Sequence, residues 1–261
     1  MESPTVILMY HELELPGRAL CQSEPGYVRY ILGESDFRSH LESLKGRGWQ
    51  GWSVGQALRF PSGRGVGITF DDGCETDLLA AAPLLQAQNF GATFYVTTGF
   101  VGKPGYLTTA QLRELHGLGF EIGCHSMTHP YLSDLDASSL EREIAGAKSQ
   151  LEQWLGAQVE HFSCPGGRYN QRVQDAVRGA GYASMATSRN QGNGKDADRF
   201  ALGRVAVLRG TSAEKFESLS SGHGLWRLSL EDGARQVLKK TLGNSAYDRV
   251  RGAILGDGKR G

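Results

Sequence analysis

Residues 66–73, which read VGITFDDG, carry the clearest signal of the fold class of this chain. Four of the first five are β-branched or aromatic, which predicts a buried strand over residues 66–70. The run ends directly in two carboxylates and a glycine, Asp71, Asp72 and Gly73. In parallel α/β folds, functional sites are built at the carboxyl ends of the strands. The stretch therefore predicts both a parallel sheet and a site at one of its edges.

The rest of the chain repeats this pattern, because short apolar runs alternate with longer segments of helical periodicity. Further strands are expected at residues 6–10, 92–97, 120–124, 159–163, 182–186 and 204–207. Helices are expected at residues 36–47, with Asp36 as N-cap, 76–89, 108–118, with Thr108 as cap, 138–155 and 170–179. Strict alternation predicts parallel strands joined by right-handed crossovers. At least six such units favour a barrel, with an open doubly wound sheet as the alternative.

Composition limits the classes of protein to consider. Of the 261 residues, 39% are hydrophobic, which is enough for a large core. Lys and Arg number 28, as do Asp and Glu, so the formal net charge is zero. This balance argues against a nucleic-acid partner. No stretch approaches the roughly 18 apolar residues of a membrane span.

The N-terminus, MESPTVILMYHE, has no basic segment followed by a long apolar run, so no secretory leader is expected. The chain as it stands is therefore predicted to be cytoplasmic, whereas a secreted or periplasmic protein trimmed of its leader would read the same. The four cysteines form no CxxC pair and are expected as free thiols. Residues 1–224 are expected as one domain. Residues 225–261 form a C-terminal extension with short helices at 230–242 and 245–255, which pack on the barrel or pair two subunits.

A second cluster of polar residues follows the strand expected at 120–124, where residues 125–130 read HSMTHP. His125 and His129, four residues apart, can meet on one turn, and imidazole suits zinc and similar metals. Each cluster alone has an ordinary interpretation, either a helix-capping turn or two polar loop histidines. Together, Asp72, His125 and His129 form the two-His, one-carboxylate set of catalytic zinc sites.

A third cluster follows the strand expected at 159–163, where residues 163–169 read SCPGGRY. The turn of Pro165, Gly166 and Gly167 allows backbone N–H groups to approach a ligand closely, and one could stabilise an oxyanion. The alternative is an ordinary turn into the next helix. His11, directly after the strand expected at 6–10, should emerge at the same edge of the sheet as the Asp pair.

Three motifs in this order, TFDDG at 69–73, HSMTHP at 125–130 and the Pro-Gly-Gly turn at 165–167, resemble one known family. It is the polysaccharide deacetylase (NodB-homology) domain of carbohydrate esterase family 4, and the resemblance covers roughly residues 5–210. It implies a distorted (β/α)7 barrel that removes acetyl groups from N-acetylated sugars or polysaccharides. It also implies one divalent metal, zinc in the first place and nickel or cobalt as alternatives.

Carried over by position, the resemblance implies a role for each motif residue. Asp71 would be the general base, and Asp72, His125 and His129 would be the metal ligands. The Gly166 N–H would stabilise the oxyanion. The rest of that turn would line the substrate site through Pro165, Gly167 and Arg168.

The family's late motif, which supplies a general acid, is not found near the C-terminus. Instead, residues 7–12 (ILMYHE) resemble the circularly permuted branch typified by deacetylases of poly-N-acetylglucosamine exopolysaccharide. On this resemblance His11 is the general acid, and Met9 walls the acetyl pocket. The alternative for His11 is a strand-end histidine without a catalytic task.

Two departures from the family pattern stand out. Ser163 occupies the place of the arginine that opens the third motif and orients the base, and Arg168 and Arg204 are the candidates to replace it. The tryptophan of the fourth motif is not found. Rival hypotheses are a non-catalytic carbohydrate-binding relative and a metal hydrolase of a non-sugar amide or cyclic ureide. The sequence leaves the sugar, its length and the oligomeric state open.

Overall fold

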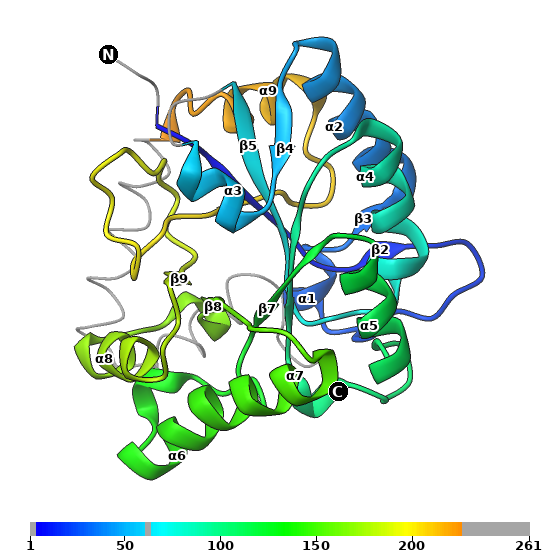
Figure 1. Ribbon diagram of the computed structural model, residues 1–261. Helices are drawn as coiled ribbons and strands as arrows, with labels where there is room; N and C mark the ends of the chain where they lie inside the picture. The colour runs from blue at the N-terminus through cyan, green and yellow to red at the C-terminus, as the bar shows by residue number, and fades with distance from the viewer. Residues whose placement is uncertain (1–3, 61–63, 226–261) are drawn as a thin grey trace, which may run out of the picture.

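A computed structural model describes residues 4–60 and 64–225 of the chain (Figure 1). The strands of its main sheet are β1 (Ile7–Tyr10), β4 (Gln50–Trp52), β5 (Gly65–Phe70), β6 (Thr93–Val96), β7 (Glu121–Cys124), β8 (His161–Ser163), β9 (Ser184–Ala186) and β10 (Val205–Ala206). Within the described residues these eight strands follow the order β10-β1-β5-β6-β7-β8-β9, with β4 beside β5. All of their pairings are parallel, as the alternating pattern predicts.

The sheet curls into a barrel-like wall, which confirms the predicted α/β barrel class. β4 pairs with residues 65–67 of β5 and β6 pairs with Thr69 and Phe70, so both strands share one edge of β5. An isolated parallel bridge between Ala186 and Leu202 spans the seam between β9 and the segment that leads into β10. The seam is thus joined by a loop rather than by a continuous ladder of strands.

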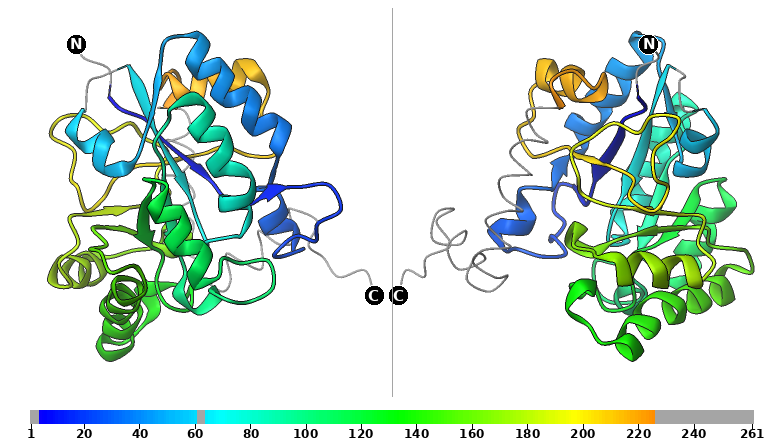
Figure 2. Two further views of the ribbon diagram at one scale, coloured as in Figure 1. Left: turned by 45° about the vertical axis from the view of Figure 1, so that its right-hand side comes forward. Right: turned by 90° about the vertical axis from the view of Figure 1, so that its left-hand side faces the viewer.

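Helices cover the outside of the sheet (Figures 1 and 2). They are α1 (Pro25–Val28), α2 (Glu34–Gly46), α3 (Val54–Arg59), α4 (Ala82–Gln88), α5 (Thr109–Gly117), α6 (Ala137–Glu141), α7 (Ala147–Leu155), α8 (Gln171–Gly179) and α9 (Ala213–Ser220). Two π-helical turns, η1 (Asp77–Ala81) and η4 (Arg142–Gly146), precede α4 and α7. Short 3₁₀ turns are η2 (Thr98–Phe100), η3 (Leu132–Asp134) and η5 (Pro165–Gly167).

The helices predicted from periodicity within the described residues are present, with one wrong cap. Thr108 caps α5 through a capping box with Gln111, as predicted. Asp36 is not the N-cap of α2, because that helix begins at Glu34 with Gly33 in the cap position. Asp36 instead lies in the first turn, where a carboxylate interacts favourably with the free N–H groups.

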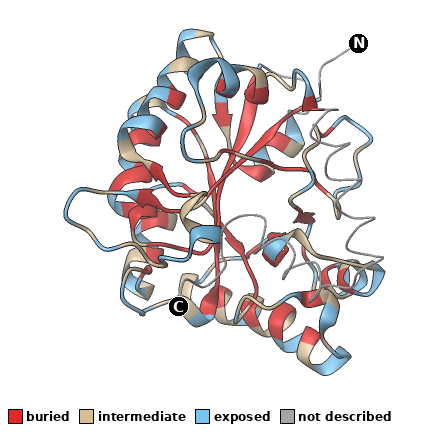
Figure 3. Ribbon diagram, turned by 180° about the vertical axis from the view of Figure 1, so that it is seen from behind, coloured by how far each residue is buried: buried red, intermediate tan, exposed pale blue. Residues whose placement is uncertain are grey.

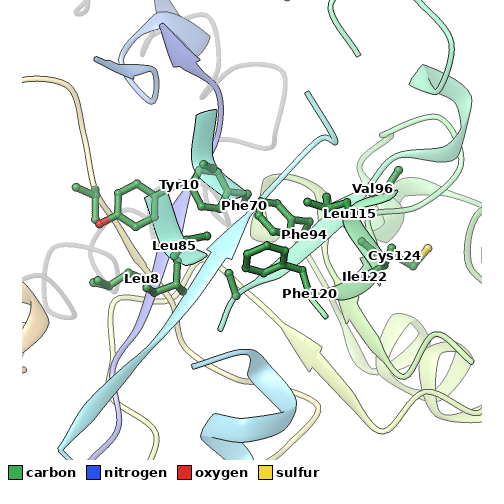
Figure 4. Packing of buried hydrophobic residues seen from close by; sticks show 14 of the residues in the cluster. Leu8, Tyr10, Phe70, Leu85, Phe94, Val96, Leu115, Phe120, Ile122 and Cys124 are labelled. Atoms are coloured by element: carbon green, nitrogen blue, oxygen red, sulfur yellow. The ribbon is translucent and has the colours of Figure 1, made fainter. Parts of the chain in front are cut away.

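Successive side chains along each strand point to opposite sides of the sheet, and the buried ones form two separate hydrophobic clusters. Leu8, Tyr10, Phe70 and Phe94 point outward and join the large cluster under the helices (Figure 4). A smaller cluster, which includes Ile7 of β1, lies on the other side of the sheet. Figure 3 shows that the strands are largely buried and that the helices are buried on one side and exposed on the other. The alternation leaves the inward side of each strand end free for polar residues.

Several short elements were not predicted. A two-stranded sheet of β2 (Leu13–Glu14) and β3 (Leu32–Gly33) is parallel, and its strands are too short to show periodicity. β4, α1 and α3 are likewise too short to show a periodic pattern. The helix α9 was also not predicted. The helices predicted at 230–242 and 245–255, and with them nearly all of the proposed extension, lie outside the described residues. Among the described residues, no helix is long and apolar enough to cross a membrane.

Candidate functional site

The polar residues singled out in the sequence meet at the carboxyl ends of neighbouring strands. Asp71 and Asp72 follow β5, and His125 follows β7. His11 follows β1, which pairs with β5, so the ends of these two strands lie side by side. The parallel order of the strands therefore gathers segments that are far apart in the chain at one rim of the barrel.

Three of these residues form a cluster that could hold a metal ion. One ligand atom each of Asp72, His125 and His129 lies within 4.8 Å of the others. Asp72 Oδ1 lies 3.7 Å from His125 Nε2 and 3.5 Å from His129 Nε2. Ligands held at about 2.0–2.1 Å from a tetrahedral zinc ion are separated by about 3.3 Å. Among the described residues, buried Asp72 Oδ1 has no hydrogen-bond partner, so the donor set fits a shared cation.

His125 is held in the tautomer that a metal ligand needs. Its Nδ1 donates to the carbonyl oxygen of Ser163 at 2.8 Å, which leaves the Nε2 lone pair facing Asp72. Burial lowers the pKa of His125 to about 3, so the ring is neutral at ordinary pH. Burial also lowers the pKa of His129. Both rings are therefore in the form that binds metals.

The loop of residues 125–129 is anchored by a buried carboxylate that sequence reasoning missed. Glu143 accepts hydrogen bonds from the N–H groups of Met127 and Thr128 at 2.9 and 2.8 Å, and from the Thr128 hydroxyl at 2.6 Å. Glu143 lies in the π-helical turn η4, and such turns are frequent at functional sites. The available signal was an acidic residue next to the apolar positions Leu140 and Ile144.

The backbone at the cluster adopts conformations that L-residues rarely take. Asp72, Ser126 and His129 have φ values of 81°, 66° and 64°. Positive φ in non-glycine residues costs free energy and is found at active sites and ligand clamps. The strain falls on two of the three donor residues, which is the pattern of a site positioned for a ligand.

Asp71 forms a bidentate ion pair with Arg204. The guanidinium donates to Oδ1 at 2.6 Å and to Oδ2 at 2.8 Å, and both side chains are buried. Burial acts to raise the pKa of Asp71, but the charges of Arg204 and His125 and the hydrogen bonds from Arg204 outweigh it. The pKa of Asp71 is therefore held well below its usual range. The carboxylate is ionised at any ordinary pH.

Arg204 is held by three further acceptors. It donates to the carbonyl of Thr187 at 3.0 Å and to the hydroxyls of Thr69 at 3.2 Å and Ser163 at 2.8 Å. Ser163 stands where the family resemblance implies an arginine, and its small side chain is hydrogen-bonded to the arginine that β10 brings in. Of the two candidates from the sequence, Arg204 thus pairs with Asp71, while the guanidinium of Arg168 lies 3.7 Å from the Tyr131 ring centre.

His11 is partly exposed, but its Nδ1 is buried and has no hydrogen-bond partner among the described residues. Its ring packs against Tyr30, with 4.8 Å between ring centres, and edge-on to Tyr27 at 6.2 Å. Burial lowers the pKa of His11, and the charges of Asp72 and Asp71 act in the opposite direction. Both tyrosines were missed, although the aromatic spacing in residues 27–30 (YVRY) was the signal.

The two glycines of the turn that follows β8 adopt the left-handed backbone conformation that favours glycine. Gly166 and Gly167 have φ values of 59° and 64°. A Cβ on Gly166 would lie 2.9 Å from the Tyr131 ring, and one on Gly167 would lie 2.6 Å from Ser188 Cβ. Pro165 is buried at the start of this turn. Met9 is buried on β1, with its Sδ 3.9 Å from the Ser188 hydroxyl. Ser188 therefore lies between β1 and the turn of residues 165–167.

Comparison with known proteins finds similarity to polysaccharide deacetylases. The family model described as polysaccharide deacetylase matches residues 60–185. YxkH of Bacillus subtilis, a protein assigned to the polysaccharide deacetylases, is 28% identical over 216 residues, which cover 80% of this chain and 74% of that protein. The peptidoglycan-N-acetylglucosamine deacetylase of Bacillus cereus is 34% identical over 127 residues, 48% of this chain and 57% of that protein. The match thus spans little more than half of the Bacillus cereus enzyme.

A solved structure shares the fold. The Streptococcus pyogenes deacetylase PplD, in complex with acetate, superposes with a TM-score of 0.74 at 23% identity, covering 84% of this chain and 99% of that one. At this identity the likeness concerns the fold alone. The sequence matches, the shared fold and the three motifs agree, and residues 60–185 of the chain match the polysaccharide deacetylase family model.

Proposed function

We propose that this protein is a metal-dependent hydrolase that removes N-acetyl groups from an N-acetylated sugar or polysaccharide. The observation that supports it most is the placement of Asp71, ionised and paired with Arg204, beside the donor set of Asp72, His125 and His129. A carboxylate base next to a two-His, one-carboxylate set is an arrangement suited to metal-assisted hydrolysis.

Asp72, His125 and His129 would hold one divalent cation, of which zinc best suits a donor set of imidazole and carboxylate. Such a cation polarises a carbonyl group and lowers the pKa of a water ligand to about 7. Asp72 also benefits from the cation, because burial raises its pKa to about 6 and leaves it without a full counter-charge.

Asp71 is the proposed general base. Its Oδ2 lies 3.8 Å from His125 Nε2, so the carboxylate borders the position where the attacking water would be held. Arg204 keeps Asp71 ionised and fixes its orientation through two hydrogen bonds. The proton that the water loses on attacking the acetyl carbon would pass to Asp71.

His11 is the proposed general acid. An amide nitrogen leaves only when it is protonated, and His11 lies within the electrostatic field of Asp71 and Asp72. Met9, two residues earlier on the same strand, would wall the acetyl pocket. The Gly166 N–H would donate to the oxyanion, and Pro165 and Gly167 would hold that turn in place. Arg168, on Tyr131, would contact the sugar beyond the reacting group.

The circularly permuted branch is the proposed place of this chain within the family. The matched range of 60–185 includes neither His11 nor Arg204. Yet β1, which precedes His11, pairs with β5 on one side and with β10 on the other. An N-terminal strand next to the strand of the Asp pair supports a general acid supplied from the start of the chain.

Acetate release from a panel of N-acetylated sugars tests the proposal. The panel runs from monosaccharides to chito- and β-1,6-linked N-acetylglucosamine oligomers, with zinc-loaded protein. Wild type and Asp196→Asn, a change of an exposed carboxylate, should release acetate. Asp71→Asn should keep its metal and lose activity by about 10²-fold or more, the contribution of a general base.

Two results would contradict the proposal. Acetate release by Asp71→Asn at the wild-type rate would exclude Asp71 as the base. No release from any sugar, with metal bound in stoichiometric amount, would favour a non-sugar amide as substrate or a binding relative without turnover.

A further inference from the structure

A second group of metal-ligating side chains lies next to the proposed active site. Ligand atoms of Glu12, Cys21 and Cys74 lie within 4.8 Å of one another, and the two Sγ atoms are 3.4 Å apart. Glu12 and Cys74 are buried and Cys21 is partly exposed. The three residues come from separate segments, after β1, between β2 and α1, and after β5. The proposed reaction uses none of them.

A fourth side chain, the carboxylate of Asp77, makes this cluster unusual. Both carboxylate oxygens of Asp77 are buried and have no hydrogen-bond partner among the described residues. Asp77 lies close enough to Cys74 and Cys21 to interact with both electrostatically. Arg18, whose charge acts on Glu12, forms its ion pair with Glu75 instead. Buried acidic groups normally have a cation or hydrogen bonds to balance them.

We propose that Glu12, Cys21 and Cys74 bind a second divalent cation of the thiophilic class, such as zinc, with Asp77 as a neighbouring counter-charge. Thiolates at about 2.3 Å from a tetrahedral zinc ion are separated by about 3.8 Å, so a small shift of the present sulfur atoms suffices. On binding, each thiol releases its proton to solvent, so that the two thiolates and the Glu12 carboxylate provide anionic ligands for the ion.

A disulfide between Cys21 and Cys74 explains fewer of the observations. Its formation would need an oxidant and would produce a neutral group. Glu12 would keep the hydrogen bonds that it accepts from the Cys21 N–H at 3.0 and 3.1 Å, but Asp77 would still be buried without a hydrogen-bond partner among the described residues. A bound cation accounts for the paired thiols, for the Glu12 carboxylate beside them and for the unpartnered Asp77 at once, so the donor set favours the metal.

The cation would have a structural task beside the active site. Cys21 Sγ lies 3.1 Å from the carbonyl oxygen of Gly105, and the Tyr27 hydroxyl lies 3.5 Å from Cys74 Sγ. Tyr27 also packs against His11. A cation here would tie the segment between β2 and α1 to the barrel and would hold Tyr27 in place against His11.

Cobalt(II) titration of the reduced, metal-free full-length protein tests this site, because thiolate ligands produce an intense near-ultraviolet charge-transfer band. The donor set of Asp72, His125 and His129 contains no sulfur and cannot produce it. We expect two cobalt ions per chain and the charge-transfer band in wild type. Cys21→Ser, a change of similar size at a partly exposed position, should lose one ion and most of the band.

Two control variants separate this site from the proposed active site. Cys164→Ser, which removes a buried thiol elsewhere, should keep both ions and the full band. His125→Ala combined with His129→Ala should lose one ion and keep the band, so the two sites can fail independently.

Either of two outcomes would overturn the proposal. One is a single cobalt ion without a charge-transfer band in the reduced wild-type protein. The other is a mass lower by two hydrogens in the purified protein, restored by reductant, with no band after reduction, which would identify a redox-active cysteine pair instead. Circular dichroism of each variant checks that the fold is retained.

Discussion

Asp71 and Asp72 are neighbours in the chain, yet their surroundings prepare them for different tasks. Both are buried, which raises the pKa of a carboxyl group. For Asp71 the ion pair with Arg204 outweighs burial, and its pKa lies well below the usual range. For Asp72 burial prevails, and its pKa rises to about 6. Asp71 is thus held as the anion, the protonation state that a base needs, whereas Asp72 lacks a counter-charge that a metal would provide.

The ion pair of Asp71 and Arg204 can be tested by a double-mutant cycle in chelator-treated protein. Arg204→Met should lower the free energy of unfolding by about 3–5 kcal/mol, because it leaves a buried carboxylate unpaired. Adding Asp71→Asn removes that charge, so the double variant should be clearly more stable than the sum of the single changes predicts. Urea unfolding provides the four values.

The exposed pair of Arg38 and Glu34 is the matched control for this cycle, with its atoms 2.7 Å apart. Arg38→Met should cost less than about 1 kcal/mol, because exposed ion pairs contribute little. Additive effects at Asp71 and Arg204 would show that the two side chains are not coupled in solution.

The role of His11 can be tested by comparing leaving groups. His11→Ala should slow hydrolysis of an N-acetyl amide by about 10²-fold or more, because the departing nitrogen needs a proton. An activated acetyl ester, whose leaving group needs none, should be affected much less. Steady-state kcat/KM values for both substrates make the comparison, and equal losses on the two would exclude His11 as the general acid.

At the scale of elements, periodicity predicted the regular helices and strands because each buries one face against the core. α2 illustrates this, since its buried residues Phe37, Leu41 and Leu44 recur at helical spacing. The same face also buries His40, whose ring stacks on Phe216 at 3.9 Å between ring centres and whose Nδ1 lies 3.4 Å from the Tyr10 hydroxyl. Periodicity places such a histidine but does not reveal its protonation state.

His40 should make stability depend on pH. Burial lowers its pKa to about 4 in the folded chain, against 6.5 for an unperturbed histidine. Between these values the unfolded chain binds more protons, so this contribution is present above pH 6.5 and is lost as the pH falls toward 4. The loss between pH 7 and pH 5 should be about 2 kcal/mol.

Urea unfolding of His40→Gln at both pH values measures this contribution. The variant should lose about 2 kcal/mol less than wild type on acidification, because glutamine does not titrate. His116→Gln, at a partly exposed histidine of α5, should keep the wild-type pH dependence. An unchanged pH dependence in His40→Gln would show that His40 titrates alike in the folded and unfolded chain.

At the scale of the whole molecule, the barrel depends on a loop that spans the seam between β9 and β10. Asn193, buried in this loop, bridges two parts of the chain. Its side chain donates to the carbonyl of Gly203 at 2.9 Å and to that of Thr5 at 3.4 Å, and it accepts from the Gly203 N–H at 2.9 Å. The amide thus fastens the segment before β1 to the segment before β10.

Asn193→Ala should destabilise the protein by about 2–4 kcal/mol, because it removes the side-chain partner of both buried backbone groups of Gly203. Gln171→Ala, which changes an exposed amide on α8, should stay within about 0.5 kcal/mol of wild type. Urea unfolding measures both variants. A cost for Asn193→Ala as small as that of the control would show that the seam does not depend on this residue.

Local patterns in the chain were enough to establish the α/β class, the parallel strands and the motifs at three strand ends. These features follow from short-range rules, because alternation and helical periodicity record which face of each element is buried. Parallel strands carry their ends to one rim, so the sequence alone was sufficient to expect Asp72, His125 and His129 together.

The partners of these residues, in contrast, are set by the folded chain. Arg204 lies 133 positions from Asp71 in the chain, and it pairs with Asp71 because the curled sheet brings β10 next to β1 and β5. Glu143 and the cluster of Cys21 and Cys74 were likewise missed from the sequence. Contacts of this kind depend on how the sheet curls and where loops cross its rim, and no local pattern in the chain records either.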